Sequence, residues 1–216
     1  MDLAVVWKYL PVLAKGAVTT VELTALAVVF GTFLGLLIAL AAISGSRVLK
    51  GCARFYTWLI RGTPLLLQLF VIYYGLPQFG LTLSPFVAAI SGLSLNAAAY
   101  IAEIIRGAIQ SVDKGQMEAA RSIGMSNLQA LLRIILPQAY RRMIPPLGNE
   151  FIALLKDSSL VATISMVDLM RTAQQMYVST FRPVEIFAAT GALYLVLTTF
   201  FTLTFGRLER KLAVYE

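Results

Sequence analysis

The sequence predicts an all-α integral membrane protein with about five transmembrane helices in a single domain covering residues 1–216. Of the 216 residues, 58% are hydrophobic and only 13% are charged, whereas a soluble domain carries about 25% charged residues. The mean hydropathy is +0.78. Apolar runs of about 20 residues, the length that spans a bilayer, recur along the chain. No internal repeat or long linker divides it.

Composition also excludes several classes of function. The chain has no histidine and one cysteine, Cys52, so it offers no imidazole base, disulfide or zinc site. It lacks a G-x-x-x-x-G-K-[ST] loop and therefore cannot itself be a P-loop ATPase. We interpret the net charge of +7 as a determinant of membrane orientation, not of nucleic acid binding. We expect no removable signal peptide, since no basic segment precedes a short apolar core at the start.

Four apolar runs predict transmembrane helices. They cover about 16–43, 55–75, 85–105 and 184–205. Only Glu22 interrupts the first run. The second is entered through the sequence Arg61-Gly62-Thr63-Pro64.

A weaker apolar segment at 143–166 completes the expected five. Pro145, Pro146 and Gly148 predict a broken helix there, with backbone groups exposed beside a cavity. The segment also carries four polar residues: Asn149, Glu150, Lys156 and Asp157. Four spans with one re-entrant segment is the alternative.

Basic residues predict the orientation, because Lys and Arg favour cytoplasmic loops. Segments 44–61 and 106–142 and the C-terminus together hold thirteen of the 18 basic residues. A five-span arrangement with the N-terminus outside places all thirteen in the cytoplasm, together with the C-terminus.

One structured, charged segment, 113–137, lies on that cytoplasmic side between the third and fourth spans. Glu118, Ala119 and Ala120 favour a helix. Gly124 can end that helix with a positive φ, and the following Ser126 can cap the next one. Two short helices meeting at a bend are therefore expected.

Spacing within this segment resembles the cytoplasmic "EAA" loop of ABC importer permeases. Glu118-Ala119-Ala120 is followed after three residues by Gly124, after nine more by Ile134, and then by Leu136-Pro137. Three further stretches look like the polar amino acid permeases: Arg61-Gly62-Thr63-Pro64-Leu65 with Gln68, Ala98-Ala99-Tyr100-Ile101-Ala102-Glu103 with Arg106-Gly107, and Lys156-Asp157-Ser158-Ser159-Leu160.

This resemblance implies a type I ABC importer permease fold in a bacterial cytoplasmic membrane. It implies a transport subunit without catalytic residues, metal or cofactor of its own, because two ATP-binding partner subunits would hold ATP and Mg²⁺. It also implies a second permease subunit, identical or related, and an extracytoplasmic binding protein that delivers an amino acid.

A rigid helix seated in a groove can transmit the closure of ATP-binding subunits to membrane helices, which a mobile loop cannot. We therefore expect the ATPase-coupling contact to consist of Glu118, Ala119, Ala120, Arg121 and Gly124.

Polar residues at membrane depth mark a candidate substrate pathway. On the third span, Asn96, Tyr100 and Glu103 share one helix face, and Asn96 lies about 15 Å deep. On the fourth, Glu150 lies roughly 12 Å deep and shares a face with Asp157. Two polar stripes could thus line one site.

An amino acid zwitterion needs anions around its ammonium and donors for its carboxylate. Glu150 or Asp157 suits the first need, and Asn96 or Lys156 suits the second. The predicted substrate-binding residues are Asn96, Tyr100, Glu150, Lys156 and Asp157.

Several of these polar residues have structural alternatives. Glu103 can form a local ion pair with Arg106, and Gln68 can serve as packing glue with Thr63. Lys156 and Asp157 can pair with neighbours at the helix end.

The excess of acidic groups favours a basic amino acid such as arginine, lysine or histidine. The expected function is ATP-driven import by alternating access. An ion-coupled secondary carrier or channel without an ATPase is the alternative, but it gives no reason for the cytoplasmic helix pair.

Overall fold

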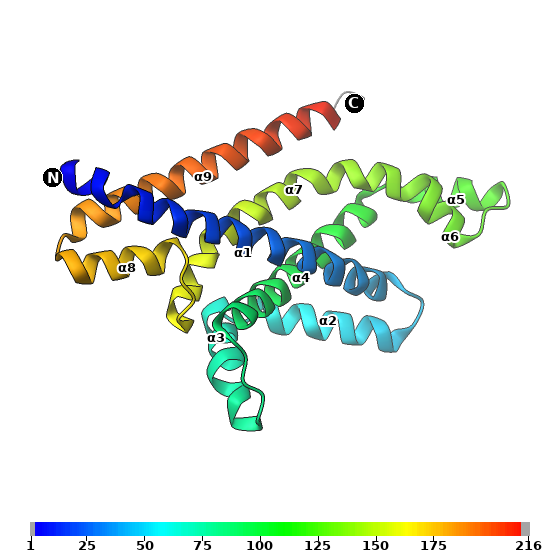
Figure 1. Ribbon diagram of the computed structural model, residues 1–216. Coiled ribbons are helices and arrows are strands. Elements are labelled where there is room, and N and C mark those ends of the chain that lie inside the picture. The colour runs from blue at the N-terminus through cyan, green and yellow to red at the C-terminus, as the bar shows by residue number, and fades with distance from the viewer. Residues whose placement is uncertain (1–2, 213–216) are drawn as a thin grey trace.

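The computed structural model describes residues 3–212 and contains only helices and their connections in that range. The long helices α1 (Leu3–Ile43), α7 (Leu136–Asp157) and α9 (Pro183–Leu212) run along the length of the molecule (Figure 1). Helix α4 (Pro85–Ser111) crosses α1 and forms the centre of the main core.

Two glycines allow α1 to lie directly on α4. A Cβ added to Gly31 would lie 2.8 Å from Cβ of Ala97, and one added to Gly35 would lie 3.0 Å from the carbonyl oxygen of Ala98. Small residues at such spacing permit close approach of membrane helices. The α1–α4 contact therefore depends on Gly31 and Gly35.

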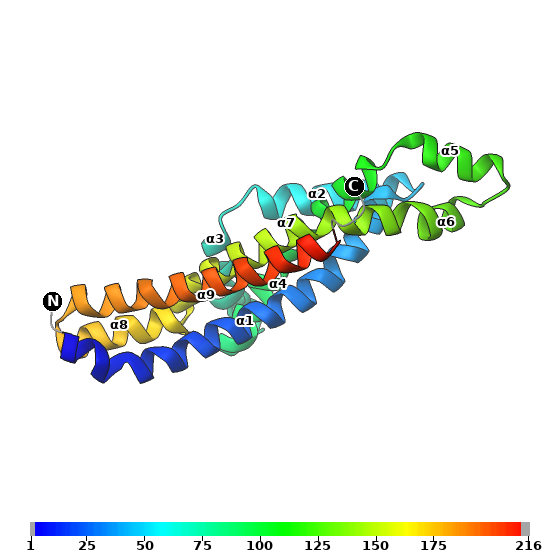
Figure 2. The same ribbon diagram turned by 90° about the horizontal axis from the view of Figure 1, so that it is seen from above.

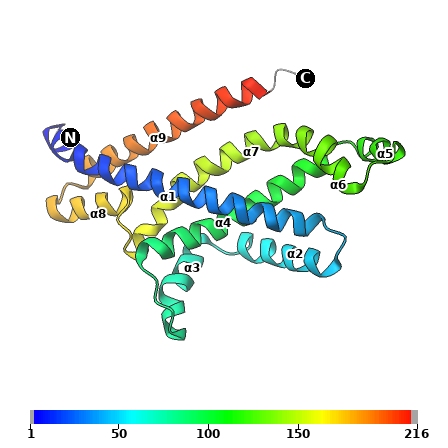
Figure 3. The same cartoon turned by 45° about the vertical axis from the view of Figure 1, so that its right-hand side comes forward.

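Helix α2 (Arg47–Arg61) ends where a single second span was predicted to continue. Gly62 follows it, and the chain then turns by 101° into α3 (Leu65–Phe70). Proline restricts its preceding residue to extended conformations, so Thr63-Pro64 breaks the helix. The predicted span over 55–75 is therefore two helices joined by a sharp bend, and Figure 3 shows α3 projecting away from the long helices.

Beyond α3, a π-helical turn (Val71–Gly75) and a 3-10 helix (Leu76–Phe79) lead back toward α4. Helix α4 begins after Ser84, whose hydroxyl accepts a hydrogen bond from the Val87 amide. This confirms a long helix at the third predicted span, although it extends six residues past the expected end at 105.

Segment 113–137 forms two short helices, as predicted. Helix α5 (Lys114–Ser122) and helix α6 (Asn127–Ala130) meet at Gly124, which has φ +90°. The Ser126 side chain caps α6 in a reciprocal capping box with Gln129. A π-helical turn (Leu131–Ile135) then joins α6 to α7. Figure 2 shows α5 and α6 at one end of the elongated molecule.

Helix α7 continues through Pro145 and Pro146, which corrects the prediction of a broken helix there. Each proline leaves one carbonyl four residues earlier without its helical partner. Gly148 instead permits packing, because a Cβ there would lie 3.0 Å from Phe205 of α9.

At the end of the molecule opposite α5, helix α8 (Leu169–Thr180) packs against α1 and α9 (Figure 2). Asp168 caps α8 by accepting a hydrogen bond of 2.8 Å from the Arg171 amide. The Thr20 hydroxyl of α1 accepts one of 3.1 Å from the Leu169 amide. Helix α8 is thereby attached to α1.

Within residues 3–212, three helices are long and apolar enough to cross a membrane: Ala4–Ile43, Pro85–Ser111 and Pro183–Leu212. The bent pair Arg47–Arg61 and Leu65–Phe79 makes four if it counts as one span. Helix α7 has sufficient length but is more polar. A multi-pass membrane protein follows, while the fifth span remains a prediction.

Candidate functional site

A cavity of about 600 Å³ lies where the end of α2 meets α4 and α7. Its size falls within the range typical of small-molecule sites. Four of the five predicted substrate residues line it, namely Asn96, Tyr100, Glu150 and Asp157. The polar stripes of α4 and α7 therefore meet, as the helix periodicities predicted.

Lys156, the fifth predicted residue, is exposed and does not line this cavity. Successive residues of an α-helix project about 100° apart, so Lys156 and Asp157 cannot both face one small space. The structure therefore does not bring Lys156 into this cavity, and its role in substrate binding stays a prediction.

Arg61 lines the cavity although the sequence grouped it with the cytoplasmic charges. Its guanidinium carbon lies 5.2 Å from the centre of the Tyr100 ring, a cation–π arrangement. One of its nitrogens lies 3.7 Å from Oε2 of Glu103. An arginine directly before Gly-Thr-Pro, inside an apolar run, was the sequence signal for a charged residue at a helix break.

Glu103 forms an ion pair and does not line the cavity. Arg106 donates to its two carboxylate oxygens from Nε at 3.1 Å and from NH2 at 2.6 Å. The local pairing with Arg106 is confirmed. Since Glu103 also approaches Arg61, it helps to fix where the Arg61 guanidinium lies.

Gln68 serves as packing glue, as expected. Its Nε2 donates to the carbonyl oxygen of Ile60 at 2.7 Å and to the hydroxyl of Thr63 at 3.0 Å. Its Oε1 accepts a bond of 3.1 Å from Nδ2 of Asn96. One N–H of Asn96 is thus already used, and the broken span is joined to α4.

The predicted coupling residues lie on α5 and the bend after it. Glu118, Ala119, Arg121 and Gly124 are exposed, but Ala120 is only 5% exposed and packs within this chain. No ion pair to Glu118 or Arg121 occurs among the described residues. Sequence reasoning missed Ile123, which is 78% exposed at the tip.

One side chain holds the two ends of this segment together. Arg142 of α7 donates to the backbone carbonyl and to the hydroxyl of Ser111 at the end of α4, the latter at 2.9 Å. Segment 113–137 therefore leaves α4 and enters α7 at a fixed junction.

Comparison with known proteins places these features in a family. Residues 31–214 match the family described as "Binding-protein-dependent transport system inner membrane component". The chain belongs to this family. Members are transport components, so the chain is a membrane transport subunit and not an enzyme.

Relatives of this inner membrane component are permeases with amino acid names. The chain is 43% identical to the L-cystine transport system permease protein TcyB of Bacillus subtilis (strain 168), over 95% of this chain and 88% of that protein. It is 37% identical to the glutamine permease GlnP of Escherichia coli (strain K12), over 99% and 98%. It is 38% identical to the arginine permease ArtQ of Bacillus subtilis (strain 168), over 98% and 97%.

Solved structures agree with this membership. One described as an amino acid ABC transporter with histidines superposes with a TM-score of 0.94 at 44% identity, covering 98% of this chain and 99% of that one. The inward-facing MetNI methionine transporter matches with a TM-score of 0.79 at 20% identity, over 99% of this chain and 100% of that one, and supports the fold alone. The resemblance to amino acid ABC permeases and the type I permease fold is confirmed.

Proposed function

We propose that this chain is the permease subunit of an ATP-driven importer that carries basic amino acids by alternating access. The observation that carries the proposal is the charge of the α2–α4–α7 cavity. It joins one guanidinium, Arg61, with two carboxylates, Glu150 and Asp157.

This arrangement suits a cationic amino acid. The Arg61 fork matches a carboxylate, and one of the two acidic side chains can accept the α-ammonium group. The second carboxylate then remains for a positively charged side chain. A neutral amino acid would leave that carboxylate unpaired in a partly buried cavity, which is unfavourable.

Names of the relatives support an amino acid but do not choose among cystine, glutamine and arginine. The cavity charge is therefore the better guide to the solute class.

Helix connectivity supports the expected coupling to ATP. Helix α5 leads through Gly124 and α6 into α7, which carries Glu150 and Asp157. A displacement of α5 by two ATP-binding subunits would thus reach the cavity through one connected helical segment. Those subunits would hold ATP and Mg²⁺, and Glu118, Ala119, Arg121 and Gly124 would form the contact on this side.

The remaining expected partners are a second permease subunit, which completes the pathway, and an extracytoplasmic binding protein, which delivers the amino acid. We place the N-terminus outside and the C-terminus in the cytoplasm. Cytoplasmic α5 and α6 require this orientation if ATP-binding subunits are to reach them. Arg61 lines the cavity and no longer counts among the thirteen basic residues assigned to the cytoplasmic side. The other twelve still support this orientation.

Direct binding to the purified permease, without the binding protein, tests the solute class. Calorimetric titration with arginine, lysine, histidine, glutamine and cystine should show binding of the cationic solutes and little heat with the others. The Asp157→Asn variant should lose most of this preference, while Lys156→Gln should keep it. Equal or tighter binding of glutamine or cystine by the unmodified chain would refute the cationic assignment.

A further inference from the structure

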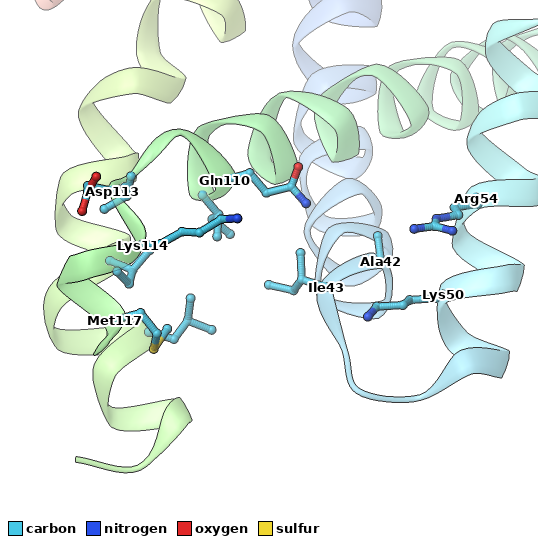
Figure 4. Close-up of a pocket in the computed structure, with 12 residues that line it drawn as sticks. Ala42, Ile43, Lys50, Arg54, Gln110, Asp113, Lys114 and Met117 are labelled. Carbon is cyan, nitrogen blue, oxygen red and sulfur yellow. The ribbon is translucent and has the colours of Figure 1, made fainter. Parts of the chain in front are cut away.

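A second cavity, of about 590 Å³, lies at the end of the molecule that carries α5. It separates the turn between α1 and α2 from the junction of α4 and α5 (Figure 4). Lys50 and Arg54 extend into it from α2, and Lys114 extends toward them from the start of α5. Three cationic side chains therefore converge on one space from two separate elements.

These three cations have no anionic partner in the part of the chain that the structure describes. No ion pair to Lys50, Arg54 or Lys114 occurs within residues 3–212. The one carboxylate of the cavity lining, Asp113, caps α5 by accepting a bond of 2.7 Å from the Gly115 amide. In Figure 4 it points away from the space between the lysines. The facing cations repel one another unless an anion lies between them.

The charge of this cavity differs from that of the substrate cavity. A zwitterionic amino acid would bring an ammonium group toward three cations and only one carboxylate, which is unfavourable. A phosphate group brings only negative charge and several acceptor oxygens, which Arg and Lys bind strongly. The lining therefore favours a phosphate group over the transported solute.

The position of the cavity indicates where such a phosphate comes from. Leu36, Leu37 and Leu40 of α1 are exposed, as expected for a surface covered by lipid chains, and α1 ends at Ile43 in the cavity wall. The cavity therefore lies where the apolar surface stops. Basic pockets between helices at the cytoplasmic membrane surface bind anionic lipid headgroups.

We propose that this cavity binds a phosphate group, supplied by an anionic phospholipid headgroup such as that of phosphatidylglycerol. The phosphate bridges Lys50 and Arg54 of α2 to Lys114 of α5. Because Lys114 is the first residue of α5, the bound headgroup links the coupling helix to α2 and restricts its orientation. This inference does not depend on which solute the permease carries.

Native mass spectrometry of the full chain tests the site directly. The detergent-purified chain is titrated with phosphatidylglycerol and, separately, with phosphatidylcholine, which has no net charge. We expect phosphatidylglycerol to bind at least about tenfold more tightly, because the quaternary ammonium of phosphatidylcholine is repelled by the three cations of the cavity. Equal binding of the two lipids would overturn the proposal.

Charge-removing variants assign the binding to this cavity. A triple variant should abolish the preference for phosphatidylglycerol. It combines Lys50→Gln, Arg54→Gln and Lys114→Gln. Arg47→Gln is the matched control, since it removes one cation from an exposed position of α2 outside the cavity. If the triple variant does not fold, the single variant Lys50→Gln should weaken the preference several-fold. The proposal is contradicted if the triple variant retains the full preference, or if Lys50→Gln retains it when the triple variant does not fold.

Two further arms identify the source of the anion. Inorganic phosphate should displace the lipid only in large excess. Displacement at a concentration equal to that of the lipid would identify free phosphate, and not the headgroup, as the ligand. A triple variant that binds phosphatidylglycerol normally, but no longer assembles with the ATP-binding subunit, would overturn the lipid site in favour of an acidic protein contact.

Discussion

Nδ2 of Asn96, on α4, lies 3.1 Å from Oε1 of Gln68, on α3, and donates a hydrogen bond to it. Gln68 in turn donates to oxygens of Ile60 and Thr63, which lie on both sides of Arg61-Gly62. Asn96 is only 7% exposed. This contact therefore fixes the broken span against α4 and sets the position from which Arg61 enters the cavity.

Replacing Gln68 should thus disturb both stability and substrate binding. Gln68→Ala removes four hydrogen bonds from partly buried groups, and we expect a loss of about 1–3 kcal/mol of stability. The apparent KM for uptake should rise because Arg61 is no longer held. Thermal unfolding in detergent and uptake kinetics measure the two effects. Gln138→Ala, which loses one exposed bond to Ile134, is the matched control; equal effects of both variants would exclude the proposed role of Gln68.

Arg61 should bind the substrate carboxylate through its fork of donors. Arg61→Lys keeps the positive charge but cannot form two parallel hydrogen bonds, so affinity should fall about tenfold. Arg61→Gln should reduce it further. Calorimetric titration with arginine measures both, and a methyl ester of arginine should bind the unmodified chain and Arg61→Lys equally weakly. An unchanged dissociation constant in Arg61→Lys would remove Arg61 from the site.

Gly124 should determine the angle between α5 and α6. Its φ of +90° is unfavourable for residues with a Cβ, so Gly124→Ala should cost about 1 kcal/mol or shift the bend. We expect weaker assembly with the ATP-binding subunit and slower ATP-driven uptake, measured by co-purification and transport assays. Gly191→Ala, in α9 with open space around the added Cβ, is the control. Normal assembly and transport in Gly124→Ala would show that this bend is not needed.

Close packing of α1 on α4 should depend on Gly31. Gly31→Val would place its Cβ closer to Ala97 and Ser94 than van der Waals contact allows. Overpacking of this kind costs about 1–3 kcal/mol. The melting temperature in detergent should fall accordingly. Gly45→Val provides the comparison, because no atom lies within 4 Å of a Cβ added there. A Gly31→Val chain as stable as the Gly45→Val chain would argue against this contact.

Local signals explain which features the sequence predicted. Helical periodicity placed Asn96 and Tyr100 on one face of α4, and Glu150 and Asp157 on one face of α7. Those faces had to meet because polar groups at membrane depth avoid lipid. Gly124 predicted a bend for an equally local reason, since its positive φ is a property of one residue.

Features that depend on tertiary packing could not be predicted in the same way. The 101° turn at Thr63-Pro64 brings Arg61 into the cavity. The number of apolar residues over 55–75 does not reveal this turn and indicates a single span. Ala120 is buried by its own chain, although its motif position indicated a partner contact. Pro145 and Pro146 lie inside the continuous helix α7, although proline commonly interrupts or kinks a helix.

ATP-driven uptake of radiolabelled arginine into proteoliposomes tests the central claim most directly. The vesicles contain this permease with its ATP-binding subunit and enclosed ATP, and the binding protein is supplied outside together with the arginine. Our account predicts that Glu150→Gln lowers uptake at least about tenfold through loss of one charged hydrogen bond, while the assembled complex and the Lys156→Gln control stay intact. Uptake by Glu150→Gln at the rate of the unmodified chain would contradict it.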